Sequence, residues 1–145
     1  MTSTAAALPA AKARLLPCLS PGNVDKVTAA PCCVIVAYDS AFYDLLPKLF
    51  PSRDMRAGYV GKPDLIAETA KRNSALQGAY LMIAARAIGL DVGAMSGFDN
   101  AKVDAAFFPD GRWKSNFLCN LGRGDASKIF ARNPRLSFEE ACRLV

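Results

Sequence analysis

The chain has 145 residues, of which 52% are apolar and 21% are charged, and its formal net charge is +5. This length is typical of one domain, so we expect residues 1–145 to form a single domain, with residues 1–10 flexible. The chain contains no histidine. That absence excludes Ser-His-Asp and Cys-His catalysis and leaves no ordinary ligand set for zinc, so we expect no metal site.

No segment approaches the ~18–20 uninterrupted apolar residues that a membrane span requires. The alanine-rich start is interrupted by Pro9, Lys12 and Arg14, so it lacks the continuous apolar stretch of a secretory signal. The five cysteines contain no CxxC pair, which is typical of buried, reduced thiols. These features predict a cytoplasmic protein with no membrane partner.

The first half of the chain predicts two short helices and one buried strand. Residues 11–19 favour a short helix, and the turn at residues 20–23 leads into a second helical segment. Residues 31–39 form a continuous β-branched and apolar run, which predicts a strand buried on both faces. A helical piece is expected over residues 40–50, followed by a loop.

The strongest predicted element is a helix within residues 63–90. Pro63 suits its first turn, Asp64 suits the positive end of the helix dipole, and Gly89 ends it. At ~1.5 Å per residue this helix is about 40 Å long. Such a helix is either the spine of the core or half of a helix-to-helix dimer seam.

The second half of the chain predicts two more helices and one strand. Asp99 suits the N-cap of a helix that runs to residue 108. Residues 114–125 predict a strand, and residues 137–140, SFEE, form a capping box that opens a last short helix. Only two or three strands are convincing in the whole chain.

The basic residues are dispersed until the tail, where four gather: Arg123, Lys128, Arg132 and Arg135. One such cluster suits a small anionic ligand better than a nucleic-acid duplex. No nucleic-acid partner is therefore expected.

Several sequence strings occur in an order typical of one family: YDSAFYDLLPKLFP, ETAKRNSALQGAYL, GLDVGAMSGFD, DAAFF, KSNFL and GDASKIFARNPRLSFEEAC. From about residue 11 onward the chain resembles the flavin-dependent nitroreductase family, and within it most closely the malonic semialdehyde reductases. The resemblance implies an α+β nitroreductase-like fold, with a mixed sheet flanked by helices, assembled as a homodimer around the long helix. FMN would be held between the subunits. The family's leading helices and strand, with their phosphate-binding arginines, have no counterpart in the sequence, so we expect an N-terminally shortened member.

Ser96 and Gly97, two of the smallest residues, stand between Met95 and Phe98. In the family, this peptide lies along the edge of the isoalloxazine ring, and its backbone N–H faces flavin N5 and O4. Small side chains let a main chain approach a flat ring. The alternative is a plain type II or related turn, in which Gly97 supplies the permissive conformation.

The resemblance implies further cofactor-binding residues. Asn23 and Lys26 match the asparagine and lysine at the pyrimidine end of the flavin, where a cation stabilises the anionic reduced form. Arg135 matches the arginine that binds the phosphate, and Arg132 is a second candidate. Without the resemblance, Asn23 is more typical of a helix cap and Lys26 of a solvated side chain. Arg132 and Arg135 are then equally typical of a solvated basic surface.

The function implied is an FMN-dependent NAD(P)H oxidoreductase without a catalytic side chain, because flavin N5 carries the hydride. NAD(P)H would be the co-substrate and malonic semialdehyde the substrate, reduced to 3-hydroxypropionate, with Lys71 or Arg72 orienting its carboxylate. Two alternatives remain open. One is a general nitroreductase or quinone-type flavin reductase, and the other is a truncated, non-catalytic remnant that no longer binds FMN.

Overall fold

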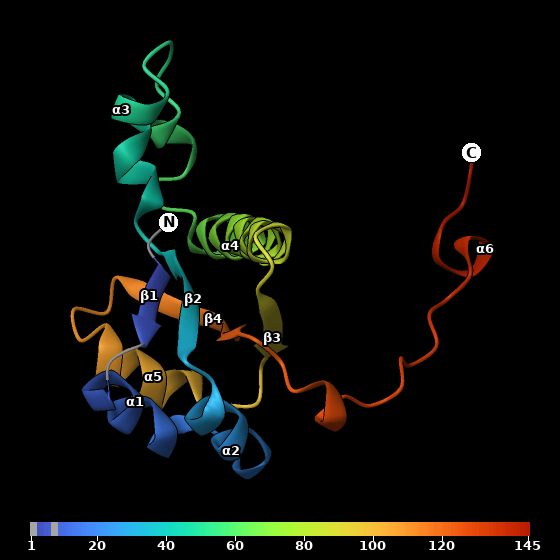
Figure 1. The fold of residues 1–145 in the computed structure, drawn as a ribbon. Helices are drawn as coiled ribbons and strands as arrows, with labels where there is room; N and C mark the ends of the chain where they lie inside the picture. Colours follow the sequence, from blue (N-terminus) through green and yellow to red (C-terminus); the bar gives the residue numbers. More distant parts are fainter. Residues whose placement is uncertain (1–2, 7–8) are drawn as a thin grey trace.

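A four-stranded sheet with helices on both faces forms the body of the protein (Figure 1). The computed structural model describes residues 3–6 and 9–145. The strands are β1 Ser3–Ala6, β2 Cys32–Asp39, β3 Asp91–Met95 and β4 Trp113–Gly122. The helices are α1 Pro9–Leu15, α2 Pro21–Ala29, α3 Leu46–Leu49, α4 Pro63–Ala87, α5 Asn100–Phe107 and α6 Phe138–Ala141. Short 3-10 turns occur at Leu16–Cys18, Phe42–Leu45, Arg56–Gly58 and Ala126–Lys128.

The strand order is β1-β2-β4-β3, and each of these pairs is antiparallel. The expected combination of helices and sheet is confirmed. The expectation of a mixed sheet is corrected for the described strands, because β2 and β3, which run in the same direction, are separated by β4, and β4 pairs antiparallel with both. One irregularity, between Val36 and Ala37, shifts the register of β2 against β4.

The core lies between β2 and the layer formed by α1, α2 and α5. Cys33, Ile35 and Ala37 belong to this core and are fully buried. Val36, on the opposite face of β2, lies beside Gly78 of α4. Because helices cover both faces, β2 has no polar face, and the predicted strand buried on both sides is confirmed.

The long helix α4 packs on the sheet through small residues. Its buried positions are Ala70, Ser74, Gly78 and Ala85. A Cβ added at Gly78 would lie 2.4 Å from Cζ of Phe117, so the helix approaches the sheet too closely for a larger residue. On the outward face, Leu76, Tyr80 and Ile83 are exposed. One face of α4 therefore packs on the sheet, and the other face leaves large apolar side chains exposed.

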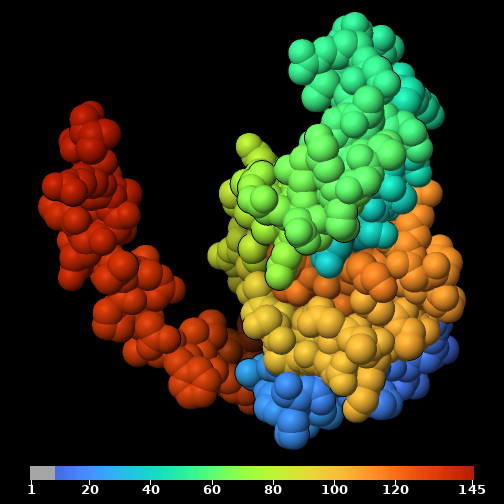
Figure 2. All heavy atoms as spheres, turned by 180° about the vertical axis from the view of Figure 1, so that it is seen from behind, coloured from blue at the N-terminus to red at the C-terminus, as the bar shows by residue number. Residues whose placement is uncertain are grey.

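Residues 40–62 form an excursion that projects from the body and includes α3 (Figures 1 and 2). Arg56 Nε donates to Asp44 Oδ1 at 2.8 Å. The ring of Tyr59 meets that of Phe42 edge-on, with centroids 5.0 Å apart. These contacts give the excursion a small packed centre of its own.

Residues 125–145 form a C-terminal arm that extends away from the body (Figures 1 and 2). Gly124 N–H donates to Asp91 Oδ2 at 2.7 Å. Beyond this link, the hydrogen bonds among the described residues of the arm stay within the arm. The predicted capping box is confirmed: Ser137 Oγ accepts from the Glu140 N–H, and the Glu140 side chain accepts from the Ser137 N–H.

The sequence alone does not predict two of the four strands, β1 and β3. β3 contains a glycine and pairs with β4 from Asp91 opposite Gly122 to Met95 opposite Leu118. β1 lies in the alanine-rich start and pairs with β2. Residues 1–2 and 7–8 lie outside the described residues, so the flexibility expected for residues 1–10 as a whole stays a prediction.

Candidate functional site

The segment that leaves β3 is tied to the start of α2. Gly97 O accepts two hydrogen bonds at 3.0 Å, one from the Ser20 N–H and one from Asn23 Nδ2. One residue further on, Phe98 forms an isolated antiparallel bridge with Leu19. Residues far apart in the chain therefore meet at this point, and the structure brings the predicted residues Asn23 and Gly97 into contact.

A side chain at position 97 would displace the amide of Asn23, which approaches Gly97 closely. A Cβ at position 97 would lie 2.5 Å from Asn23 Nδ2. The turn here is closed by the Phe98 N–H, which donates to Ser96 O at 3.0 Å, an i to i+2 bond of the γ-turn kind. Of the alternative, a type II or related turn, the type II form is wrong because it needs a positive φ, and among the described glycines positive φ occurs only at Gly61, Gly89 and Gly111. A related tight turn is what the structure shows.

The outer side of this turn presents hydrogen-bond donors. The N–H of Gly97 has no acceptor in the described part of the chain. Lys26, which is exposed, places Nζ 3.4 Å from Asn23 Oδ1. Ser96 is exposed beside them. Asn23 contacts both the Gly97 carbonyl and the Lys26 ammonium group. An uncommitted main-chain donor and an ammonium group linked in this way suit a ligand edge that carries acceptor atoms and gains negative charge.

A flavin fits this set of donors, because N5, O4, N1 and O2 of its ring are hydrogen-bond acceptors. We refer to Asn23, Lys26, Ser96 and Gly97 as the donor edge. No group of three or more potential metal ligands occurs among residues 3–6 and 9–145.

Arg132 and Arg135 are not brought to the donor edge within the same chain. Both are exposed on the C-terminal arm, which Figure 2 shows standing apart from the body. Arg135 Nη1 donates to the carbonyls of Asn133 and Pro134, at 2.9 and 3.1 Å. Its guanidinium therefore has only local partners.

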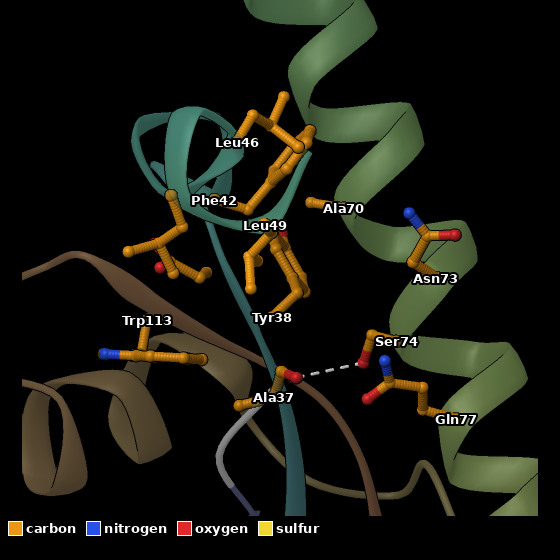
Figure 3. A pocket seen from close by; sticks show the side chains of 12 residues that line it. Ala37, Tyr38, Phe42, Leu46, Leu49, Ala70, Asn73, Ser74, Gln77 and Trp113 are labelled. Atoms are coloured by element: carbon orange, nitrogen blue, oxygen red, sulfur yellow. Dashed lines mark hydrogen bonds between the residues drawn. The ribbon is translucent and has the colours of Figure 1, made fainter. Parts of the chain in front are cut away.

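A cavity of about 250 Å³ lies between β2, the excursion and α4 (Figure 3). Phe42, Leu46 and Trp113 contribute apolar walls, and Asn73 and Gln77 contribute amides from α4. Sequence reasoning missed this cavity, because its walls come from segments that are far apart in the chain.

An ion pair between a buried carboxylate and a half-buried arginine lies where the excursion leaves β2. Asp39, only 7% exposed, accepts from Arg112 Nε at 2.8 Å and Nη2 at 2.6 Å. The Ala41 N–H donates to the same carboxylate at 2.8 Å. Burial alone would raise the pKa of Asp39, but the hydrogen bonds from Arg112 and Ala41 outweigh it and hold the pKa below its ordinary value.

Curated relatives are similar to most of this chain. A protein of Rhodopseudomonas palustris named as an NADH dehydrogenase/NAD(P)H nitroreductase is 76% identical over 135 residues, which are 93% of this chain and 69% of that protein. One of the same name from Ralstonia nicotianae is 60% identical over 136 residues, covering 94% of this chain and 70% of the relative. No family model matches the chain.

Solved structures share the fold at low sequence identity. A nitroreductase from Exiguobacterium sibiricum in complex with FMN superposes with a TM-score of 0.85 at 19% identity, covering 99% of this chain and 76% of that one. The nitroreductase ydfN of Bacillus subtilis gives a TM-score of 0.84 at 17% identity, over 99% and 77% of the two chains. The arrangement of strands and helices described above is therefore the fold of these proteins.

Proposed function

The chain belongs to the NADH dehydrogenase/NAD(P)H nitroreductase family, and we propose that it is an oxidoreductase that binds FMN and uses NAD(P)H. The observation that carries this proposal is the donor edge, where the Gly97 N–H is uncommitted and Lys26 adds a positive charge. The fold shared with an FMN complex supports the proposal.

When bound, FMN supplies the site that accepts and donates hydride. The protein's own residues would bind and tune it. Gly97 would donate its N–H to the ring edge where charge develops, and Lys26 would offset the negative charge of the reduced ring. Asn23 would act indirectly, because its bond to Gly97 O holds the turn in place. Protons would come from water, since the chain contains no histidine.

The proposed active unit is a homodimer. The outward face of α4 carries Leu76, Tyr80 and Ile83, which are 56%, 75% and 65% exposed. Large apolar side chains on the arm are also uncovered, and Phe130 and Phe138 are 93% and 57% exposed. A second copy that covers the α4 face and receives the arm would remove both apolar surfaces from water.

Such a dimer would also explain where Arg132 and Arg135 act. Within one chain they are remote from the donor edge, whereas in the proposed dimer the arm of one copy would lie on the other copy. Guanidinium groups suit a phosphate because they donate in a fixed fork. We therefore assign the phosphate of FMN to the arm and its ring to the donor edge, with the two supplied by different copies.

The proposed substrate is a small carbonyl acid, malonic semialdehyde. The carbonyl carbon would gain the hydride that NAD(P)H loses, and the oxygen would gain a proton from water, which gives 3-hydroxypropionate and NAD(P)⁺. A general nitroreductase is the second candidate, favoured by the apolar walls that Phe42 and Trp113 give to the cavity in Figure 3. The ratio of kcat/KM for malonic semialdehyde and for a nitroarene distinguishes the two.

The experiment that tests FMN binding compares two lysine variants. The purified chain, supplied with FMN, is expected to retain the flavin absorbance band after gel filtration and to oxidise NAD(P)H. Lys26→Gln should weaken FMN binding about tenfold, the size expected for one charge-assisted hydrogen bond. Lys48→Gln removes the same charge from the exposed surface of α3 and should have no effect. A chain that stays colourless after reconstitution would contradict the proposal and favour the non-catalytic remnant.

A further inference from the structure

A second cavity, of about 200 Å³, lies between α4, α5 and the strands β2 and β4. Its lining is polar and comes from all four elements: Tyr38, Lys71, Asn100, Asp104, Lys114 and Asn116. None of these residues belongs to the donor edge. The volume admits a small organic acid and is too small for a nucleotide.

The charges around this cavity leave one cation in excess. Asp104 Oδ1 accepts from the N–H and the hydroxyl of Ser115, at 2.8 and 2.7 Å. Lys114 Nζ lies 3.9 Å from Asp104 Oδ2, so these two charges face one another. Lys71 Nζ has no ion-pair or hydrogen-bond partner within the described ranges. By contrast, its neighbour Arg72 pairs with Glu68, so the free cation beside the cavity is Lys71.

A second donor lines the same cavity as Lys71. The hydroxyl of Tyr38 has no hydrogen-bond partner in the part of the chain that the structure describes. Burial, with a smaller contribution from the nearby Asp104, raises the pKa of Tyr38 above its ordinary value. The phenol therefore stays protonated near neutral pH and can donate a hydrogen bond.

Two amides offer acceptors to the same cavity, and their orientation follows from their partners. Asn100 Nδ2 lies 2.9 Å from Ser115 O, which can only accept. Asn116 Nδ2 lies 3.3 Å from the hydroxyl of Ser74, which already donates its proton to Ala37 O. Each nitrogen must therefore face its partner, which leaves each amide oxygen available to accept from a ligand.

We propose that this cavity binds a small hydroxycarboxylate. Lys71 and Tyr38 hold the carboxylate, and the amide oxygens of Asn100 and Asn116 accept from the hydroxyl group. This pairing matches the uncommitted donors and acceptors of the cavity. This cavity shares Tyr38 with the first cavity but no residue with the donor edge, and the proposal is tested by binding alone, without a reductant.

The test is isothermal titration calorimetry at constant ionic strength, with L-lactate and propionate as a pair that differs by one hydroxyl. Saturable lactate binding is expected, with propionate about tenfold weaker because an amide oxygen loses its partner. Lys71→Gln should weaken lactate binding about tenfold. Lys114→Gln should also weaken it, since Asp104 would then repel the carboxylate. Lys48→Gln, which lies outside the cavity, should bind as the unmodified chain does.

Three results would overturn the proposal. They are the absence of saturable lactate binding, an equal loss in Lys71→Gln and Lys48→Gln, and tighter binding of inorganic phosphate than of lactate, which would mark the site as one for phosphate. Unchanged melting temperatures for the variants ensure that a loss of binding reports on the cavity, because Lys71 is an exposed side chain.

Discussion

Replacing Arg112 by glutamine is expected to destabilise the protein far more than the same change at Arg56, although each arginine makes an ion pair with an aspartate at 2.8 Å or less. The side chain of Asp39, the partner of Arg112, is 6% exposed. That of Asp44, the partner of Arg56, is 45% exposed. Removing one member of a buried pair costs about 3–5 kcal/mol because the remaining charge is uncompensated, whereas an exposed pair contributes about 0–1 kcal/mol.

The loss of stability expected for Arg112→Gln is smaller than that for a fully buried ion pair. Arg112 itself is 40% exposed, so water can take part of its place beside Asp39. We therefore expect a loss of about 2 kcal/mol in the free energy of unfolding at pH 7, and less than about 1 kcal/mol for Arg56→Gln. Urea denaturation followed by circular dichroism, at one fixed protein concentration, measures both values.

The pH dependence gives a second readout. The pKa of Asp39 is lowered in the folded protein, so its pairing contributes stability above its unfolded pKa. This contribution is lost as the pH falls through the folded pKa. The difference between the unmodified chain and Arg112→Gln should therefore shrink as the pH falls below about 4. Equal losses for the two arginine variants, or a difference that stays constant down to pH 3, would refute the reasoning.

Three further predictions follow from contacts described above. Gly97→Ala should weaken FMN binding at least tenfold and lower the free energy of unfolding by about 1–3 kcal/mol, because its Cβ meets Asn23. Adding Asn23→Ala should recover part of the stability but not the binding, and full recovery of both would contradict the indirect role given to Asn23. Ile83→Glu should shift the mass measured by light scattering from dimer to monomer, and an unchanged mass would exclude the α4 face as the seam. A thiol reagent at pH 8 should modify the exposed Cys142 quickly, and Cys33 only after unfolding, because burial raises the pKa of Cys33 to about 12. Rapid labelling of more than two thiols in the folded protein would contradict the burial of Cys18, Cys33 and Cys119.

The elements that could be predicted from the sequence are those with local signals. Asp99 caps α5 by accepting from the Lys102 N–H, as expected from its place before the helix. The run of apolar residues in β2 and the capping box before α6 are signals of the same kind. Each depends on residues within one turn or one strand, so no knowledge of the rest of the chain is needed.

Features that depend on distant partners could not be predicted in this way. β3 has few β-forming residues and exists because β4 pairs with it along its whole length. Asp39 and Arg112 are 73 residues apart, and the sequence around either residue gives no indication that the two form an ion pair. The arm was expected to bring Arg132 and Arg135 to the cofactor, but no local pattern shows whether it folds onto its own chain or away from it.

Gly97 shows how a structural requirement can also serve binding. The two peptide planes around this residue are fixed by internal bonds: Ser96 O accepts from the Phe98 N–H, and Gly97 O accepts from Ser20 and Asn23. In a trans peptide, the N–H points opposite to the carbonyl oxygen. Fixing Ser96 O therefore also fixes the direction of the Gly97 N–H, which is the donor left without an acceptor among the described residues. A donor held in this way needs no reorganisation when negative charge develops next to it. The contact with Asn23 that disfavours a side chain at position 97 therefore also prepares the amide to bind.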